Sequence, residues 1–393
     1  MQAGQNGESS ANSLNAWSAD LEAELRALEA KGLKRHLRVA SPGIDFASND
    51  YLALNASGRL LELLTQRVQG LHEQVGSTGS RLVRGHHHLF EQVEDQFARF
   101  AGQESALLFH SGYAANVGSL QALMGQRDLV FCDRLCHASL LDGVRLSGAR
   151  RHYFAHNDLN DLENLLQRHQ SKRGRRWIVS EALFSMDGDS PDLPALCGLA
   201  DRHGALVCLD EAHSIGVLGP GGAGLAVQHG LANQIALHVF PCGKAPGLQG
   251  AFVAGRAAVR EILIQRARSF VFSTAQPPFL AALLGDVLEE MRTGAMQAAR
   301  EHLNRLSSYL TERLAGAGFE VGGAYSVIVP IIVGEEARAL ALAERLQNEG
   351  LDVRPIRPPT VPAGTSRLRI SLHANHRTQD LDRLINLLRG QSV

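Results

Sequence analysis

A lysine in an apolar, glycine-rich loop is the residue of this sequence with the clearest chemical potential. Lys244 lies between two apolar runs, residues 236–240 and 250–255, and has Gly243 and Gly247 close by. A loop lysine is usually a solvated surface residue, but apolar surroundings desolvate the amine and lower its pKa. An amine in that state can form a Schiff base with an aldehyde.

Two other segments place polar groups at the ends of expected strands. In ALVCLDEAHSIGVLG, Asp210 ends an apolar strand and His213 follows three residues later. Folds of the α/β class bind ligands at such strand ends, although a strand-end acid with an incidental histidine explains this segment alone equally well. In LLFHSGYAANVG, a strand runs through residues 111–113 into a helix whose first N–H groups can bind an anion. The amine, the carboxylate and the anion cradle are together the groups that pyridoxal phosphate requires.

The elements that must position these groups alternate between short strands and helices. Several of the expected strands are apolar throughout, as strands are when both faces of a mainly parallel sheet are covered. Helical periodicity lies between them, for example in residues 89–102, where Phe90, Val93 and Phe97 share one face. This alternation predicts an α/β fold with a mainly parallel central sheet flanked by helices. The expected strands are residues 106–109, 129–132, 152–155, 177–180, 205–210, 236–240 and 250–255.

A length of 393 residues predicts more than one lobe. Residues 1–43 are expected to form a polar tail and a helix over about 16–38, where leucines recur at helical spacing. Residues 44–290 are expected to form the large α/β domain. Residues 291–393 are expected to form a smaller α+β domain, with a hinge in MRTGAM near residue 291.

Composition excludes several classes of protein. The formal net charge is -1 and the basic residues are scattered, so neither a nucleic-acid partner nor a membrane anchor is expected. The N-terminus lacks the layout of a signal peptide, and the five cysteines form no C-x-x-C pair. We therefore expect a cytoplasmic protein. Cys132, Cys136 and His137 lie close in sequence, but a structural zinc usually needs four suitably spaced ligands, so no metal site is expected.

Seven short motifs in one order carry a resemblance to a known family. The chain resembles the α-oxoamine synthase family, transferases of the fold-type I pyridoxal-phosphate class, over nearly all of residues 20–390. The resemblance implies an acyltransferase with pyridoxal phosphate as its cofactor. The motifs are FASNDYL (46–52), GSTGSRLVRG (76–85), DRLCHASLLDG (133–143), EALFSMDGD (181–189), DEAHSIGVLG (210–219), GKA (243–245) and IRPPTVPAGTSRLRISL (356–372).

The resemblance also implies four catalytic residues. Lys244 is expected to hold the cofactor as a Schiff base and then to remove the α-proton of the amino acid. Asp210 is expected to pair with the pyridine nitrogen of the cofactor, and His213 with its phenolate oxygen. His137 is expected to lie over the face of the cofactor ring and to help place the substrate, where an ordinary loop histidine is the alternative.

The phosphate of the cofactor is expected to bind the backbone N–H groups of Gly112 and Tyr113, aided by Ser185. Thr274, in FSTAQPP, resembles a phosphate contact that the second subunit contributes, which implies a homodimer. One position departs from the family pattern, because a threonine or serine usually stands where this chain has Pro241. Proline has neither a hydroxyl nor an N–H, so we expect weaker retention of the cofactor.

Substrate residues follow from the same resemblance. Arg369 matches the arginine that binds the amino-acid carboxylate, and Asn49 and Thr360 are further expected contacts. Arg357 and Arg35 are candidates for a substrate carboxylate or a carrier phosphate, although surface salt bridges explain either equally well.

The string IRPPTVP resembles family members that join L-alanine to pimeloyl-CoA or pimeloyl-acyl carrier protein, with loss of CO2, in biotin biosynthesis. A relative that uses glycine or serine is the alternative with the same chemistry. A protein that binds the cofactor without catalysis, and a phosphate-binding module without the cofactor, are further alternatives.

Overall fold

The fold was obtained as a computed structural model, which describes residues 5–37, 39–40, 42–69, 75–169, 174–322 and 326–389, with side chains from residue 13. The chain divides into two units, residues 1–42 and residues 43–393. Each unit is described by itself.

The first unit contains one long helix, α1 (Gln5–Ala30). The expected range of 16–38 was wrong at both ends, since the helix includes much of the polar segment expected to be a tail. Once an apolar stripe has nucleated a helix, adding further polar residues costs little. The helix ends early because Gly32 adopts φ +66°, and the Leu33 N–H then donates to the Leu28 carbonyl at 2.8 Å. That bond is typical of a glycine-terminated helix.

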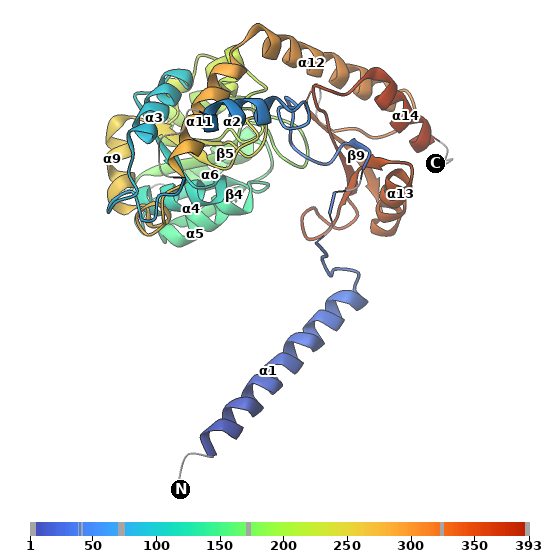
Figure 1. Cartoon of the computed structure of the whole chain (residues 1–393), viewed down its shortest axis with the longest axis horizontal. Helices are drawn as coiled ribbons and strands as arrows, with labels where there is room; N and C mark the ends of the chain where they lie inside the picture. Colours follow the sequence, from blue (N-terminus) through green and yellow to red (C-terminus); the bar gives the residue numbers. More distant parts are fainter. Residues whose placement is uncertain are drawn as a thin grey trace. The chain divides into compact units, whose positions relative to one another are not determined.

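A seven-stranded sheet lies at the centre of the described part of residues 43–393 (Figure 1). Its order is β2-β8-β7-β6-β5-β3-β4. Strand β8 is antiparallel to both of its neighbours, and every other pair is parallel. All seven expected strands and the mainly parallel sheet are therefore confirmed. The strands are β2 (Ser105–Phe109), β3 (Leu129–Asp133), β4 (Arg150–Phe154), β5 (Arg176–Glu181), β6 (Ala205–Asp210), β7 (Leu237–Pro241) and β8 (Ala251–Gly255).

Both faces of the sheet are buried, because successive residues of its strands belong to different hydrophobic clusters. In β5, Trp177 and Val179 pack with α4 and α5, whereas Ile178 packs with α6 and α7. Covering both faces explains why several of the inner strands are apolar throughout, whereas the edge strand β4 is polar and largely exposed. The helices of this part are α2 (Arg59–Gln69), α3 (His88–Phe100), α4 (Gly112–Leu123), α5 (Ala138–Ser147), α6 (Leu159–Arg168), α7 (Leu193–Arg202), α8 (Leu225–Gln228), α9 (Ala257–Arg266), α10 (Arg268–Val271) and α11 (Pro278–Met291), with 3-10 turns at Pro220–Gly222 and Ala232–Gln234.

The C-terminal elements form the expected α+β arrangement. A three-stranded antiparallel sheet has the order β11-β12-β9, and β1 pairs with β10 in parallel. Helix α11 ends at the expected hinge and α12 begins directly after it, while the domain boundary at residues 290/291 stays a prediction. These elements are β1 (Ile44–Asp45), α12 (Gly294–Ala315), β9 (Ile328–Gly334), α13 (Glu336–Asn348), β10 (Leu351–Asp352), β11 (Arg354–Ile356), β12 (Ser366–Ser371) and α14 (Thr378–Arg389).

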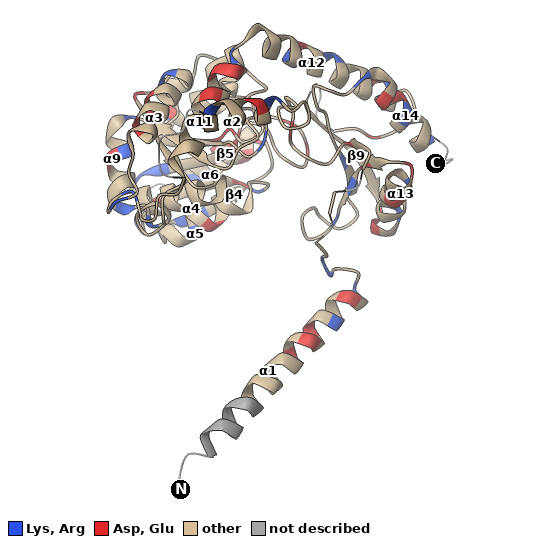
Figure 2. Cartoon of the chain, in the orientation of Figure 1, with Lys and Arg blue, Asp and Glu red and all other residues tan. Residues whose placement is uncertain are grey.

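Charged residues of both signs are interspersed along the helices, as Figure 2 shows. Within the described ranges, no helix combines the length and the apolar character needed to cross a membrane.

The packing of α3 on the sheet gives a test of this fold. Phe97 is fully buried, and its ring stacks on Phe252 of β8 with centroids 4.0 Å apart. Replacing a buried phenylalanine with alanine leaves a cavity, so Phe97→Ala should lower the free energy of unfolding by about 3–5 kcal/mol. Urea unfolding at one fixed protein concentration measures the loss. Leu340→Ala, on the exposed side of α13, is the control, and an equal loss in both variants would contradict the packing described here.

Candidate active site

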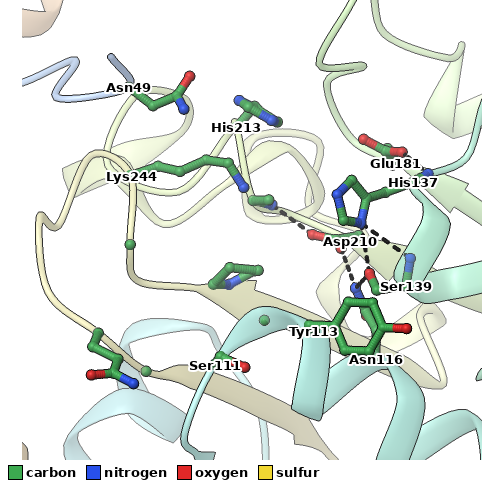
Figure 3. A pocket seen from close by; sticks show the side chains of 16 residues that line it. Asn49, Ser111, Tyr113, Asn116, His137, Ser139, Glu181, Asp210, His213 and Lys244 are labelled. Carbon is green, nitrogen blue, oxygen red and sulfur yellow. Dashed lines mark hydrogen bonds between the residues drawn. The ribbon is translucent and has the colours of Figure 1, made fainter. Parts of the chain in front are cut away.

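A cavity of about 300 Å³ lies where several strands of the central sheet end (Figure 3). Asp210 is the last residue of β6, and Glu181, the last residue of β5, is its register partner. Because the carboxyl ends of parallel strands meet at one edge of a sheet, the fold brings these groups together. Seven of the residues expected from the sequence line this cavity, namely Asn49, Gly112, Tyr113, His137, Asp210, His213 and Lys244.

The Lys244 amine is available for chemistry. Its side chain is half-buried and points toward the part of the cavity where Asp210 and His137 lie (Figure 3). Within the described part of the chain, it has no hydrogen bond or ion pair. Burial, and then the positive charge of Arg369, lower the pKa of Lys244 below its usual value, although Asp210 and Glu181 oppose the shift. A larger share of the amine is therefore uncharged, as attack on an aldehyde requires.

A hydrogen-bonded chain links Asp210 to His137. Asn116 on α4 donates from Nδ2 to Asp210 Oδ2 at 2.7 Å and to Ser139 Oγ at 2.9 Å. The second carboxylate oxygen, Oδ1, accepts from the Ala212 N–H at 2.9 Å. These donors stabilise negative charge on a buried carboxylate, which could pair with a protonated ring nitrogen.

The same chain fixes which nitrogen of His137 carries the proton. The backbone N–H of Ser139 lies 3.2 Å from His137 Nδ1, and Ser139 Oγ lies 2.7 Å from it. A backbone N–H can only donate, so Nδ1 is the acceptor and the neutral ring has its proton on Nε2. Burial, and then the charge of Lys244, lower the pKa of His137. At neutral pH His137 therefore presents an N–H donor to the cavity.

Glu181 lines the cavity although the sequence analysis gave it no role. Its Oε1 accepts the His137 N–H at 2.6 Å. Burial, and then the neighbouring charge of Asp210, raise the pKa of Glu181 to about 8. A carboxylate at the end of an apolar strand is the signal that singled out Asp210, and it applied equally here. Asn116 offered no such signal, because an asparagine within a helix is usually unremarkable.

A second network lies on the other side of Lys244. Tyr51 is fully buried, and its hydroxyl lies 2.7 Å from His213 Nδ1 and 2.9 Å from Asn49 Oδ1. Arg369 donates from Nη2 to Asn49 Oδ1 at 2.9 Å and from Nε to the Ser185 carbonyl at 2.5 Å. Burial, followed by the charges of Lys244 and Arg369, lowers the pKa of His213 well below its usual value. His213 is therefore a neutral hydrogen-bonding group.

The beginning of α4 forms a cradle suited to a phosphate. Ser111 caps the helix by accepting the Ala114 N–H at 3.2 Å. The N–H groups of Gly112 and Tyr113, in the first turn, have no acceptor within the described residues. A Cβ on Gly112 would lie 2.7 Å from Cγ of Pro241, so only glycine fits against this proline. The cradle, the unpaired amine and the buried carboxylate together fit pyridoxal phosphate.

The remaining predicted site residues do not line this cavity. Arg369 reaches it through Asn49, and Ser185 contributes its carbonyl to Arg369. Thr274 is exposed, and its expected role in a second subunit stays a prediction. Arg357 is paired with Glu336 at 2.6 Å, Thr360 is exposed, and Arg35 belongs to the separately described first unit, so the roles expected of these three residues also stay predictions.

Residues 41–388 match the protein family Aminotransferase class I and II. The chain belongs to this family. The match runs from before β1 into α14 and so includes most of the chain. The cavity described above therefore belongs to the part of the chain that matches the family.

Two curated relatives with high identity carry the same enzyme name. The 8-amino-7-oxononanoate synthase 1 of Polaromonas sp. is 41% identical over 95% of this chain and 96% of its own length. The 8-amino-7-oxononanoate synthase of Geobacter sulfurreducens is 44% identical over 92% of this chain and 95% of its own length. The resemblance to α-oxoamine synthases expected from the motifs is confirmed.

Three solved structures are also similar to this chain. A serine palmitoyltransferase from Sphingomonas wittichii superimposes with a TM-score of 0.85 at 29% identity, covering 94% of this chain and 96% of its own. A second serine palmitoyltransferase structure, solved with its pyridoxal phosphate, matches equally well. The 8-amino-7-oxononanoate synthase of Francisella tularensis has a TM-score of 0.76 at 28% identity, covering 88% and 97% of the two chains.

The position of Pro241 in the cavity wall gives a test of cofactor retention. Pro241 lines the cavity beside the cradle and has no polar hydrogen to donate. Pro241→Thr adds a hydroxyl there, and a hydrogen bond to a charged group should tighten binding of pyridoxal phosphate about tenfold. The absorption of lysine-bound cofactor after equilibrium dialysis measures the affinity. Pro241→Ala is the matched control, and an equal gain in that variant would show that the missing hydroxyl is not the cause.

Proposed function

We propose that this chain makes 8-amino-7-oxononanoate from L-alanine and a pimeloyl thioester, with release of CO2 and of the thiol. The carbon skeleton of the product supports these substrates. A seven-carbon dicarboxylic acyl group supplies the first seven carbons. Alanine without its carboxylate supplies the other two, which are the carbon that bears the amino group and the terminal methyl carbon. The observation that carries the proposal is an unpaired, half-buried lysine amine beside Asp210, in a chain 41–44% identical to relatives with this enzyme name.

The proposal assigns pyridoxal phosphate as the cofactor. When bound, it supplies an electron-accepting ring that stabilises negative charge on the carbon next to the amino group. Lys244 would hold its aldehyde, Asp210 would keep a proton on its ring nitrogen, and His213 would hydrogen-bond its phenolate oxygen. Gly112 and Tyr113 would donate their N–H groups to its phosphate.

Lys244 and His137 are the residues of the chain that would transfer protons and donate hydrogen bonds during the reaction. Lys244, which would hold the cofactor until L-alanine binds, would then be free to accept the α-proton of alanine at Nζ. The α-carbon would form a bond to the thioester carbonyl carbon, and the thiolate would leave and take a proton from solvent. The carboxylate of alanine leaves as CO2, and a proton returns from Nζ of Lys244 to the α-carbon. The Nε2–H of His137 can donate to a substrate oxygen throughout.

Arg369 is the proposed anchor for the alanine carboxylate. Its guanidinium is almost fully buried and is directed by Asn49, Ser185 and Ser371, the last through Nη1 at 2.7 Å. A carboxylate that took the place of Asn49 and Tyr51 at Nη2 would bind this guanidinium through charge-assisted hydrogen bonds.

Further partners follow from the same proposal. The acyl donor is pimeloyl-CoA or pimeloyl-acyl carrier protein. We also propose a homodimer, in which Thr274 of each copy approaches the phosphate site of the other, and a location in the cytoplasm.

One structural observation favours a second candidate function. The serine palmitoyltransferase structures have the higher TM-score, 0.85 against 0.76 for the solved 8-amino-7-oxononanoate synthase. A relative that uses serine or glycine would employ the same lysine, carboxylate and cradle. The sequence identities of 41–44% weigh against it, since the serine palmitoyltransferases reach only 29%.

An amino-acid panel with a lysine variant tests the function. The purified protein with pyridoxal phosphate should change its absorption on addition of L-alanine, and much less with glycine or serine, and pimeloyl-CoA should then release CoA. Lys244→Ala should lose the lysine-bound band and at least a thousandfold in turnover, because both the covalent anchor and the proposed base are gone. Lys31→Ala is the control, because Lys31 is exposed and directly follows α1 in the first unit. Normal turnover in the Lys244 variant would refute the assignment, and a best response to serine would select the alternative.

A conservative change at the proposed carboxylate anchor gives a second test. Arg369→Lys keeps the charge but loses the planar pair of donors, so KM for L-alanine should rise about tenfold or more. The cofactor band and KM for pimeloyl-CoA should change little. Steady-state kinetics with each substrate varied in turn measures both constants. An unchanged KM for alanine would place the carboxylate elsewhere.

A further inference from the structure

A second cluster of titratable groups lies outside the cavity, and the proposed reaction does not use it. His156, just after β4, lies between two carboxylates. Its Nδ1 is 3.0 Å from Asp133 Oδ1, and its Nε2 is 3.0 Å from Asp189 Oδ2. A neutral imidazole has a single N–H and can donate to only one of them. Donation to both carboxylates requires the doubly protonated, positively charged ring.

The surroundings of His156 favour this charged form. Asp133, at the end of β3, is fully buried and also accepts the Asn157 N–H at 2.8 Å. Asn157 Nδ2 donates to Asp189 at 2.8 Å, so one asparagine bridges the same two acids. Bonds and charge from Asp133 and Asp189 outweigh burial and raise the pKa of His156 to about 10. The imidazole and the ring of Phe184 are nearly perpendicular, with their centroids 4.4 Å apart.

Other charged groups near His156 bind the backbone instead of the ring. Arg134 donates to the Phe154 carbonyl at 3.4 Å, and Asp161 accepts the Ala155 N–H at 2.8 Å. Among the described residues that contact the imidazole ring, the two aspartates are therefore the groups that balance the charge of His156.

Asp189 closes a short loop, residues 184–189. The Phe184 N–H donates to the Asp189 carbonyl at 2.8 Å, and the Gly188 N–H donates to the Phe184 carbonyl at 2.9 Å. Gly188 has φ +66°, and a Cβ there would lie 2.1 Å from the Ile328 carbonyl oxygen of β9. The loop is thus pressed against the C-terminal three-stranded sheet.

The 184–189 loop also holds the two arginines of β12. Arg367 donates from Nη1 to Asp187 at 2.5 Å, and Arg369 donates from Nε to the Ser185 carbonyl at 2.5 Å. A continuous set of contacts therefore runs from His156 through Asp189 and the loop to the guanidinium of Arg369.

We propose that the positively charged His156 is a positioning residue for the amino-acid carboxylate. By fixing the 184–189 loop to the end of β3, it holds the Ser185 carbonyl where it directs Arg369 toward Asn49 and the cavity. This inference rests on the proposed function, in which Arg369 binds the carboxylate, and it deepens that proposal. Losing the charge of His156 would loosen Arg369 without touching Lys244 or the phosphate cradle.

The test compares His156→Gln, which cannot donate to both acids as a cation, with His156→Arg, which keeps a charged donor to both. In the enzyme loaded with pyridoxal phosphate, the Gln variant should bind L-alanine about tenfold more weakly, measured by the absorption change. KM for pimeloyl-CoA and the retained cofactor should stay within about twofold of the parent. The Arg variant should recover at least half of the lost affinity on a logarithmic scale. His203→Asn, which removes a histidine paired with the single carboxylate of Glu163, is the matched control.

Two further measurements separate positioning from mere structural support. In an Arg369→Lys background, His156→Gln should have little additional effect on alanine binding, because both changes act on one contact. The folded pKa near 10 exceeds the usual 6.5. The stabilisation from this ion pair is therefore full below pH 6.5, falls as pH rises toward 10 and is absent above it. The stability difference between the parent and the Gln variant should shrink over that range.

Unchanged alanine affinity in His156→Gln, or full additivity with Arg369→Lys, overturns the positioning role even if stability falls. If the parent responds to serine or glycine better than to alanine, the proposed substrate fails. The same comparison made with that amino acid still decides the role of His156.

Discussion

The site depends on one constraint, which is that two carboxylates occupy adjacent strand ends. Strands β5 and β6 run parallel, and their register places Glu181 beside Asp210 in a buried place. Burial and the nearby charge of Asp210 raise the pKa of Glu181, so the two acids do not both carry a full negative charge at neutral pH. Asn116 and the Ala212 N–H stabilise Asp210, and the His137 N–H stabilises Glu181. Lys244 then faces a site of negative potential, where Asp210 could pair with a protonated ring nitrogen.

The two histidines of the cavity are neutral for the same reason but are connected differently. Burial and the nearby positive charge of Lys244 lower the pKa of both His137 and His213. His137 has its tautomer set by a backbone N–H, which leaves no freedom. His213 contacts the hydroxyl of Tyr51, which can donate or accept. One histidine is therefore a fixed donor, whereas the other can adapt to the group that it meets.

Sequence reasoning recovered the sheet and the centre of the site because both depend on local patterns. Apolar runs marked all seven strands, and strand ends with glycine-rich turns pointed to Lys244, Asp210 and the cradle at Gly112. It missed Glu181 and Asn116, whose importance arises from the register of neighbouring strands and from contacts across the fold. It also misplaced both ends of α1, where a glycine turn and propagation of the helix decide the boundaries.

The contact between Arg369 and Asn49 joins positions 320 residues apart. During synthesis on the ribosome, the lysine loop and most of the central sheet emerge well before the strand that carries Arg369. Contacts so distant in sequence also form slowly, because a long chain segment must be closed first. The contact that directs Arg369, the proposed carboxylate anchor, can therefore form only after β12 has been made. The residues proposed to hold the cofactor are therefore made before the arginine proposed to bind the amino acid.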